Sequence, residues 1–212
     1  MRLNLLRFVS LGAAVLAFLA AAVFLLFPKY AFVERLLKEN RISVLAERVR
    51  EGFNELLYLD GTIFLPEGLK ISYRKFEIKV VPPSAELVCK GGGSLEGRLG
   101  VGGAEFLLRN FNCLNRVEGA DGKLLLTRRG EVFGDLNLKG LNLKGINLKS
   151  ADFRFHGGRF EGVLNLGGLK LKGGGTLRVD FNRGIYVDAV FTGSGTKVFV
   201  KGYLPNPEVV VR

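Results

Sequence analysis

The chain has almost none of the side chains that build metal sites and nucleophilic catalytic centres. Its 212 residues include one histidine, two cysteines and no tryptophan. A zinc site is excluded because the sequence has neither a CxxC pair nor a second histidine. The single histidine, His156 in FRFHGG, has no serine or cysteine partner motif, so we interpret it as a surface or turn residue.

Motifs that bind cofactors or phosphates are missing as well. The two GGG runs, at residues 91–93 and 173–175, do not match a P-loop or a dinucleotide-binding loop, and we expect both to be hairpin turns or bulges. Aspartate and glutamate occur singly, without the spacing of a catalytic acid pair or of a calcium loop. We therefore predict a protein that is not an enzyme and that binds no cofactor and no metal.

A long apolar run is present at the N-terminus. Val9 to Phe27 contains no charged residue, and its nineteen residues would rise about 28 Å as a helix, close to the thickness of a hydrocarbon core. Arg2 and Arg7 precede the run, which favours a cytoplasmic N-terminus. The alternative is a cleaved signal peptide with Ala20–Ala22 at the cleavage site, but the run continues beyond the usual length of such a segment.

These features predict residues 1–28 as a single-pass anchor in a bacterial inner membrane, with the remainder of the chain in the periplasm. The net charge is +11, from 31 Lys and Arg against 20 Asp and Glu. A basic surface attracts anions, and the predicted crossing favours anionic lipid over nucleic acid as the partner. The sequence thus predicts membrane lipid as a partner and no nucleic acid.

Residues 29–59 are predicted to be a membrane-proximal amphipathic segment. KYAFVERLLKEN, at 29–40, has Tyr30, Val33, Leu36 and Leu37 at helical spacing. RISVLAERVREGFNELLYL, at 41–59, is ambiguous, because its apolar residues fit a helix somewhat better than a strand while Gly52 interrupts both.

From residue 60 to 212 the pattern is that of β-structure. Apolar residues alternate with polar ones, and glycines interrupt the alternation at intervals typical of hairpins. The predicted strands are 69–81, 84–90, 93–101, 104–111, 122–129, 131–138, 153–166, 168–173, 175–181, 184–191 and 197–204. The connections are short, which predicts a mainly β, twisted antiparallel meander. Since helical cover is scarce, we expect the sheet to form an open groove; a closed β-barrel or a sandwich is the alternative.

One stretch, GDLNLKGLNLKGINLKSADFRF at 134–155, repeats with a period of five. Four such units are too few for a pentapeptide β-helix, and a straight strand would change its apolar face at every unit. We predict that Gly140 and Gly145 reset the register by a bulge, a positive φ or a break in pairing.

The two cysteines, Cys89 and Cys113, are compatible with a disulfide in an oxidising compartment. Their spacing alone does not separate a disulfide from two buried thiols that never meet.

The layout of the whole chain resembles the type II secretion system protein N family and, more broadly, the AsmA-like envelope proteins. The similar stretches are LFPKYAFVERLLKEN, LLYLDGTIFLPEGLKISYRKFEI, GVLNLGGLKLKGGGTLRVDF and KGYLPNP. The resemblance implies an inner-membrane protein with a twisted sheet and a hydrophobic groove, either an accessory component of type II secretion or a lipid-handling module. It also implies that residues 42–48 form a strand.

The residues that we expect to line a lipid groove are Leu164, Leu166, Leu169, Leu171, Leu177, Val179 and Phe181. The same residues would otherwise form an ordinary closed core. A second functional hypothesis is a structural scaffold that binds secretion-system or other envelope proteins through exposed strand edges.

Overall fold

The structure is a computed structural model that describes residues 29–39, 41–65, 68–114, 117–143, 146–180, 184–204 and 207–212. The predicted anchor at residues 1–28 lies outside these ranges. Within them, no helix combines the length and the apolar character needed to cross a membrane.

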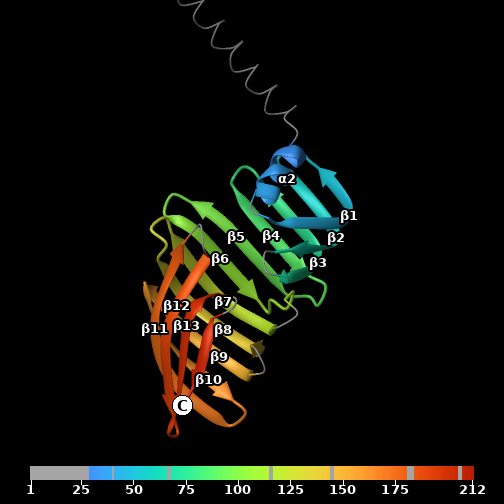
Figure 1. The fold of residues 1–212 in the computed structure, drawn as a ribbon. Helices are drawn as coiled ribbons and strands as arrows, with labels where there is room; N and C mark the ends of the chain where they lie inside the picture. Colours follow the sequence, from blue (N-terminus) through green and yellow to red (C-terminus); the bar gives the residue numbers. More distant parts are fainter. Residues whose placement is uncertain are drawn as a thin grey trace, which may run out of the picture.

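The described chain is one helix followed by one large antiparallel sheet (Figure 1). The helix, α2, spans Lys29–Glu39, as predicted, and carries two ion pairs at i,i+4 spacing, Arg35 with Glu39 and Glu34 with Lys38. The strands are β1 (Ser43–Glu51), β2 (Glu55–Phe64), β3 (Lys70–Lys79), β4 (Ser84–Cys89), β5 (Ser94–Gly100), β6 (Gly103–Arg109), β7 (Val117–Thr127), β8 (Val132–Leu143), β9 (Ile146–Gly157), β10 (Arg159–Leu166), β11 (Leu169–Asp180), β12 (Gly184–Gly193), β13 (Thr196–Tyr203) and β14 (Glu208–Val211).

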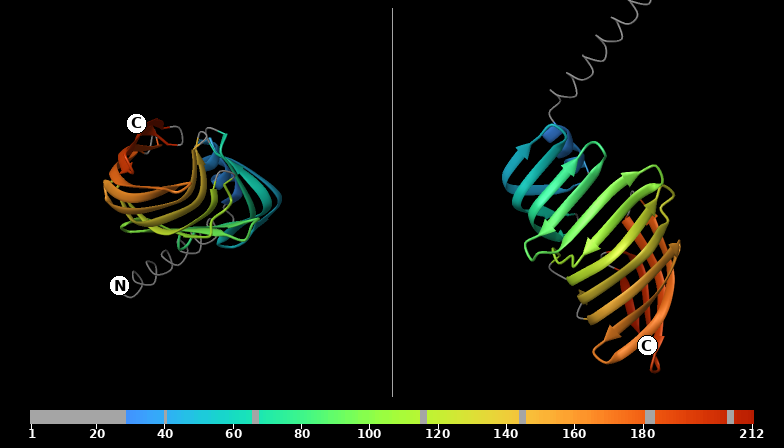
Figure 2. Two further views of the ribbon diagram at one scale, coloured as in Figure 1. Left: turned by 90° about the horizontal axis from the view of Figure 1, so that it is seen from below. Right: turned by 180° about the vertical axis from the view of Figure 1, so that it is seen from behind.

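Each strand pairs with the next one along the chain, so the order in the sheet is the order in the sequence. The first and last strands do not pair with each other, and the sheet is therefore open. The predicted antiparallel meander is confirmed, and the closed barrel is wrong. Figure 2 shows the sheet bending round along its length, with the C-terminal strands turned back toward the middle ones.

The helical alternative for residues 41–59 is wrong, and the strand expected at 42–48 is present. These residues form β1 and the start of β2, joined by a turn in which Gly52 N–H donates to the Glu55 carbonyl. The apolar residues that fit a helical stripe lie on both faces of β1, where Val44 and Ala46 pack on the core and Leu45 is exposed. Pairing with β2 overrides the local pattern. The sheet thus begins at Ser43, and the domain boundary predicted between residues 59 and 60 falls inside β2.

Two other predicted boundaries are also wrong. Residues 153–166 are not one strand, because Gly157, with φ 75°, and Gly158 turn the chain between β9 and β10. The GGG run at 173–175 is neither a turn nor a bulge: it lies inside the continuous strand β11, whereas the run at 91–93 does form the β4–β5 turn.

The five-residue repeat is divided between two strands. Gly140 has φ 59°, as predicted for a register reset, while Gly145 lies outside the described residues. Leu138 and Leu141 therefore both contact the same apolar cluster although their positions in β8 have opposite parity. On the neighbouring strand β9, Leu148 and Ala151 are likewise both buried. In both strands the buried side chains switch to residues of the other parity at the same height in the sheet, beside Gly140.

The core covers one face of the sheet, here called the inner face. It consists of two apolar clusters, one built mainly on β2–β7 and the other on β8–β14, and Leu136 and Leu138 contact both. Helix α2 covers only the N-terminal end, where Val33 packs on the first cluster and the Tyr30 ring lies 6.4 Å from that of Tyr58. The apolar inner face is therefore continuous from β2 to β14.

Candidate functional site

The predicted groove residues lie together on the inner face. Leu164 of β10 is paired with Leu171 of β11, and Leu166 with Leu169. Leu164 and Leu171 are buried, whereas Leu166, Leu169 and Leu177 are half-buried and contact the same cluster. Val179 is half-buried next to Leu177 on β11, and Phe181 lies outside the described residues.

Four phenylalanines fill the middle of this face, and the sequence analysis did not single them out. The ring of Phe160 lies 5.8 Å from Phe155, 5.9 Å from Phe153 and 6.4 Å from Phe191. Alternating phenylalanines in DFRF, at 152–155, were the available signal. The centre of the predicted groove is thus an aromatic core, and half-buried leucines lie toward both ends of β10 and β11.

Glycines opposite these rings bring the strands close together. A methyl group at Gly162 would lie 2.7 Å from the Phe153 ring, and one at Gly175 would lie 2.0 Å from the Asp188 carbonyl oxygen. Gly173 has the same close approach to β12. Glycine inside a strand marks such contacts between backbones. The GGG run therefore allows β10, β11 and β12 to curl under the phenylalanine rings.

A hollow of about 560 Å³ lies at the rim of the sheet, at the end of β11. It lies between the β7–β8 turn, the β9–β10 turn and strands β11–β13, and Leu177 belongs both to its lining and to the apolar cluster. Its polar lining includes Arg129, Glu131 and Arg178, and the rings of Tyr186 and Tyr203 meet edge to face at 5.2 Å. Arg178, Tyr186 and Tyr203 occupy paired positions that alternate with the inner-face residues Leu177 and Val187, so these three side chains lie on the outer side of the sheet.

The N-terminal part of the inner face is closed by the connection between β6 and β7. Cys113 in this connection forms a disulfide with Cys89 of β4, so the structure pairs the two cysteines. The Ser72 N–H donates to the Cys113 carbonyl oxygen, and Phe111 is buried. The connection is therefore fixed over β3 and β4 as part of the core.

Two tyrosines in this part of the core have strongly shifted acidities. Burial raises the pKa of Tyr58 and of Tyr73 to about 12, and the Asp60 carboxylate acts in the same direction on Tyr73. The Tyr73 hydroxyl donates to the Leu45 carbonyl oxygen at 2.9 Å and so ties β3 to β1.

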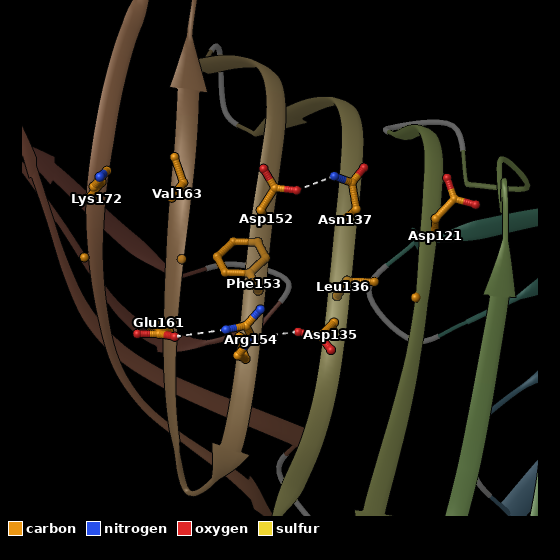
Figure 3. A pocket seen from close by; sticks show the side chains of 13 residues that line it. Asp121, Asp135, Leu136, Asn137, Asp152, Phe153, Arg154, Glu161, Val163 and Lys172 are labelled. Atoms are coloured by element: carbon orange, nitrogen blue, oxygen red, sulfur yellow. Dashed lines mark hydrogen bonds and ion pairs between the residues drawn. The ribbon is translucent and has the colours of Figure 1, made fainter.

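The outer face carries a second hollow, of about 700 Å³, across β7–β11 (Figure 3). Strand pairing arranges its walls as two rows of side chains, one with Asp121, Asn137, Asp152, Val163 and Lys172 and the other with Asp135, Arg154 and Glu161.

The charges of these rows are largely paired with one another. The Arg154 guanidinium lies 3.0 Å from Asp135 and 4.0 Å from Glu161, and Asn137 donates to Asp152. Asp121 accepts from the Asn110 N–H, which, together with Lys139, holds its pKa below the usual value. The hollow is therefore a polar surface whose lining has four carboxylates and two cations.

Among the described residues, no group of three histidine, cysteine, aspartate or glutamate side chains is placed to hold a metal ion. His156 is exposed on β9.

Comparisons with known proteins give one relative and no family. The chain is 27% identical over 192 residues to an uncharacterized protein of Aquifex aeolicus (strain VF5), a match that covers 88% of this chain and 86% of the relative. No protein-family profile matches the chain, and no solved structure matches it.

Proposed function

We propose that this chain is a non-enzymatic, membrane-anchored periplasmic protein that handles lipid along the inner face of its sheet. In this proposal, residues 1–28 hold it in the inner membrane, and it acts as an AsmA-like lipid-handling module or as an accessory component of type II secretion. It uses no cofactor and no nucleic acid.

The observation that carries the proposal is the continuous apolar face of an open sheet. In the described chain, α2 is the only helix, and it covers the N-terminal end alone. More of the apolar side chains in the two clusters are half-buried than fully buried. Beyond the part that the β6–β7 connection closes, this apolar surface remains partly accessible and suits an acyl chain, which requires contact area and no directed polar group.

The hollow beside Leu177 supports an amphiphilic ligand. An acyl chain on the inner face would reach the rim of the sheet at Leu177, where Arg129 of the β7–β8 turn offers a guanidinium group that matches a phosphate headgroup.

The experiment is crosslinking to lipid in native membranes. A photoreactive amino acid is placed at Leu169 on the inner face or, as the matched control, at Leu125, an outer leucine that is 38% exposed. After irradiation, the purified protein is analysed by mass spectrometry. We expect a phospholipid adduct at Leu169 and none at Leu125; equal labelling at both positions, or no adduct at either, contradicts lipid handling.

A scaffold that binds envelope proteins through strand edges is the second candidate. It is favoured by β14, whose Val209, Val210 and Val211 form a short apolar edge strand paired on one side only. Replacing Val211 by proline blocks the edge. Loss of co-purifying envelope proteins with retention of the lipid adduct would favour the scaffold.

A further inference from the structure

Three hairpin turns on one rim of the sheet carry large apolar side chains that are mostly exposed. Phe53 in the β1–β2 turn is 65% exposed, Val81 in the β3–β4 turn 60%, and Val101 in the β5–β6 turn 90%. Leu99, at the end of β5, is 63% exposed. Turns ordinarily carry glycine, proline, asparagine and other polar residues, so three apolar tips on one rim are unusual.

The opposite rim of the sheet has different turns. Its turns between β4 and β5, β10 and β11, and β12 and β13 have the tips Lys90–Gly92, Gly167–Gly168 and Ser194–Gly195. Its other described connections contain Leu65, Leu69, Phe111 and Leu114, which are half-buried or buried. On the rim of the apolar tips, the β7–β8 turn is polar. Among the described turns, apolar side chains at least 60% exposed therefore occur at the three N-terminal turns of one rim.

This rim lies on the side of the molecule where α2 is found. In Figures 1 and 2, the three turns form a row across the end of the sheet that carries α2. Helix α2 directly follows residues 1–28, the predicted membrane anchor. The apolar tips thus occur at the end of the sheet where the chain leads toward that segment.

A cation precedes each tip at a similar distance. Arg50 comes three residues before Phe53, Lys79 two before Val81, and Arg98 three before Val101, and all three cations are exposed. Lys79 and Arg98 also form ion pairs with Glu77 and Glu96. Basic side chains near an apolar tip add an electrostatic attraction to anionic headgroups when the tip enters the interface.

We infer that the β1–β2, β3–β4 and β5–β6 turns insert their apolar tips into the surface of the lipid bilayer. The domain is then held with one rim against the membrane instead of hanging from a single tether. The inference rests on the proposed membrane location and is independent of lipid handling by the inner face.

The test places a fluorescent label at the tips of the full-length chain in vesicles of phosphatidylethanolamine and phosphatidylglycerol. Single cysteines replace Val81 or Val101, and Lys170, exposed near the opposite rim, is the control position. Both native cysteines are in the disulfide, so the introduced thiol is the only free one. Quenching by nitroxide-labelled lipid is compared with quenching by aqueous iodide.

We expect lipid quenching with iodide protection at Val81 and Val101, and the reverse at Lys170. Replacing the other two tips with aspartate should lower the ratio of inserted to water-exposed label at least about tenfold, since each tip loses the burial of a large apolar side chain. Because these residues are exposed, the variants should fold normally. A chain that floats with the vesicles but keeps both tip labels in water overturns the inference alone, whereas a chain that does not float overturns the proposed membrane location as well.

Discussion

A row of three glutamates on the outer face gives the most direct test of the energetics of this sheet. Glu77 of β3 is paired with Glu86 of β4, which is paired with Glu96 of β5. Like charges on adjacent strands destabilise a sheet. Lys75 offsets the repulsion, because its ammonium lies 2.5 Å from Glu77 and 2.8 Å from Glu86, and Lys79 lies 3.0 Å from Glu77.

The size of the effect follows from the acidity of Glu77. This residue is 7% exposed, and hydrogen bonds from Lys75 first and Lys79 second lower its pKa from 4.5 to about 2. At about 1.4 kcal/mol per pKa unit, the two lysines together stabilise the folded chain by about 3 kcal/mol at pH 7. Because Lys79 remains, we expect Lys75→Met to lower the free energy of unfolding by about 2 kcal/mol.

The pH dependence of the stability tests whether this electrostatic reasoning about Glu77 and Lys75 is right. The folded pKa lies below the unfolded one, so the stabilisation is complete above pH 4.5 and is lost as the pH falls toward 2. Urea unfolding followed by far-UV circular dichroism should therefore show a difference between the wild type and Lys75→Met that is largest at pH 7 and shrinks as the pH falls below 4.5. Lys123→Met, which removes an exposed ion pair with Glu105, is the matched control and should have a much smaller effect. A difference for Lys75→Met that does not change with pH would refute the electrostatic reasoning.

Three further predictions concern the core. Replacing Cys89 and Cys113 with alanine opens a loop of sequence separation 24 and should lower the free energy of unfolding by about 3 kcal/mol, measured by urea unfolding. Gly175→Ala forces a methyl group against the β12 backbone and should cost about 2 kcal/mol in the same assay, whereas Gly158→Ala, with no atom nearer than 3.8 Å, should be nearly neutral. Tyr73→Phe removes a buried hydrogen bond and should lower the free energy of unfolding by about 1 kcal/mol. In the wild type, the raised pKa of Tyr73 means that stability is lost as the pH rises from 10 toward 12. An alkaline titration followed by ultraviolet absorbance should show this.

The antiparallel meander was predictable because hairpin signals are local. Period-two alternation and glycine punctuation identify strands without knowledge of their partners. The prediction failed where contact with a neighbouring strand, and not the local sequence, decides the secondary structure. Residues 43–51 fit a helical stripe, and only pairing with β2 makes them a strand; Gly173–Gly175 read as a turn, and only the close approach of β12 explains three glycines inside β11.

The candidate site was predictable to a similar extent. Alternation placed Leu164, Leu169 and Leu171 on one face, as the structure has them. The alternating phenylalanines of residues 152–155 were a partial signal for the aromatic centre of that face, but Phe191 of β12 was not predictable, because it meets Phe153 and Phe160 only through the curl of the sheet. The hollow with Arg129 and Arg178 was likewise hidden, because it combines turns and strands that are distant in the sequence.

The two apolar surfaces of the molecule are under different physical constraints. The inner face stabilises the fold, so a polar substitution at Leu171, which is fully buried, should unfold the domain whether or not lipid is handled there. The rim tips are mostly exposed, and Val101, at 90% exposure, can become aspartate at almost no cost in stability. A loss of function in Val101→Asp with an unchanged free energy of unfolding would therefore report on the membrane surface alone. At the half-buried Leu169, a substitution changes both stability and ligand contact, so both have to be measured.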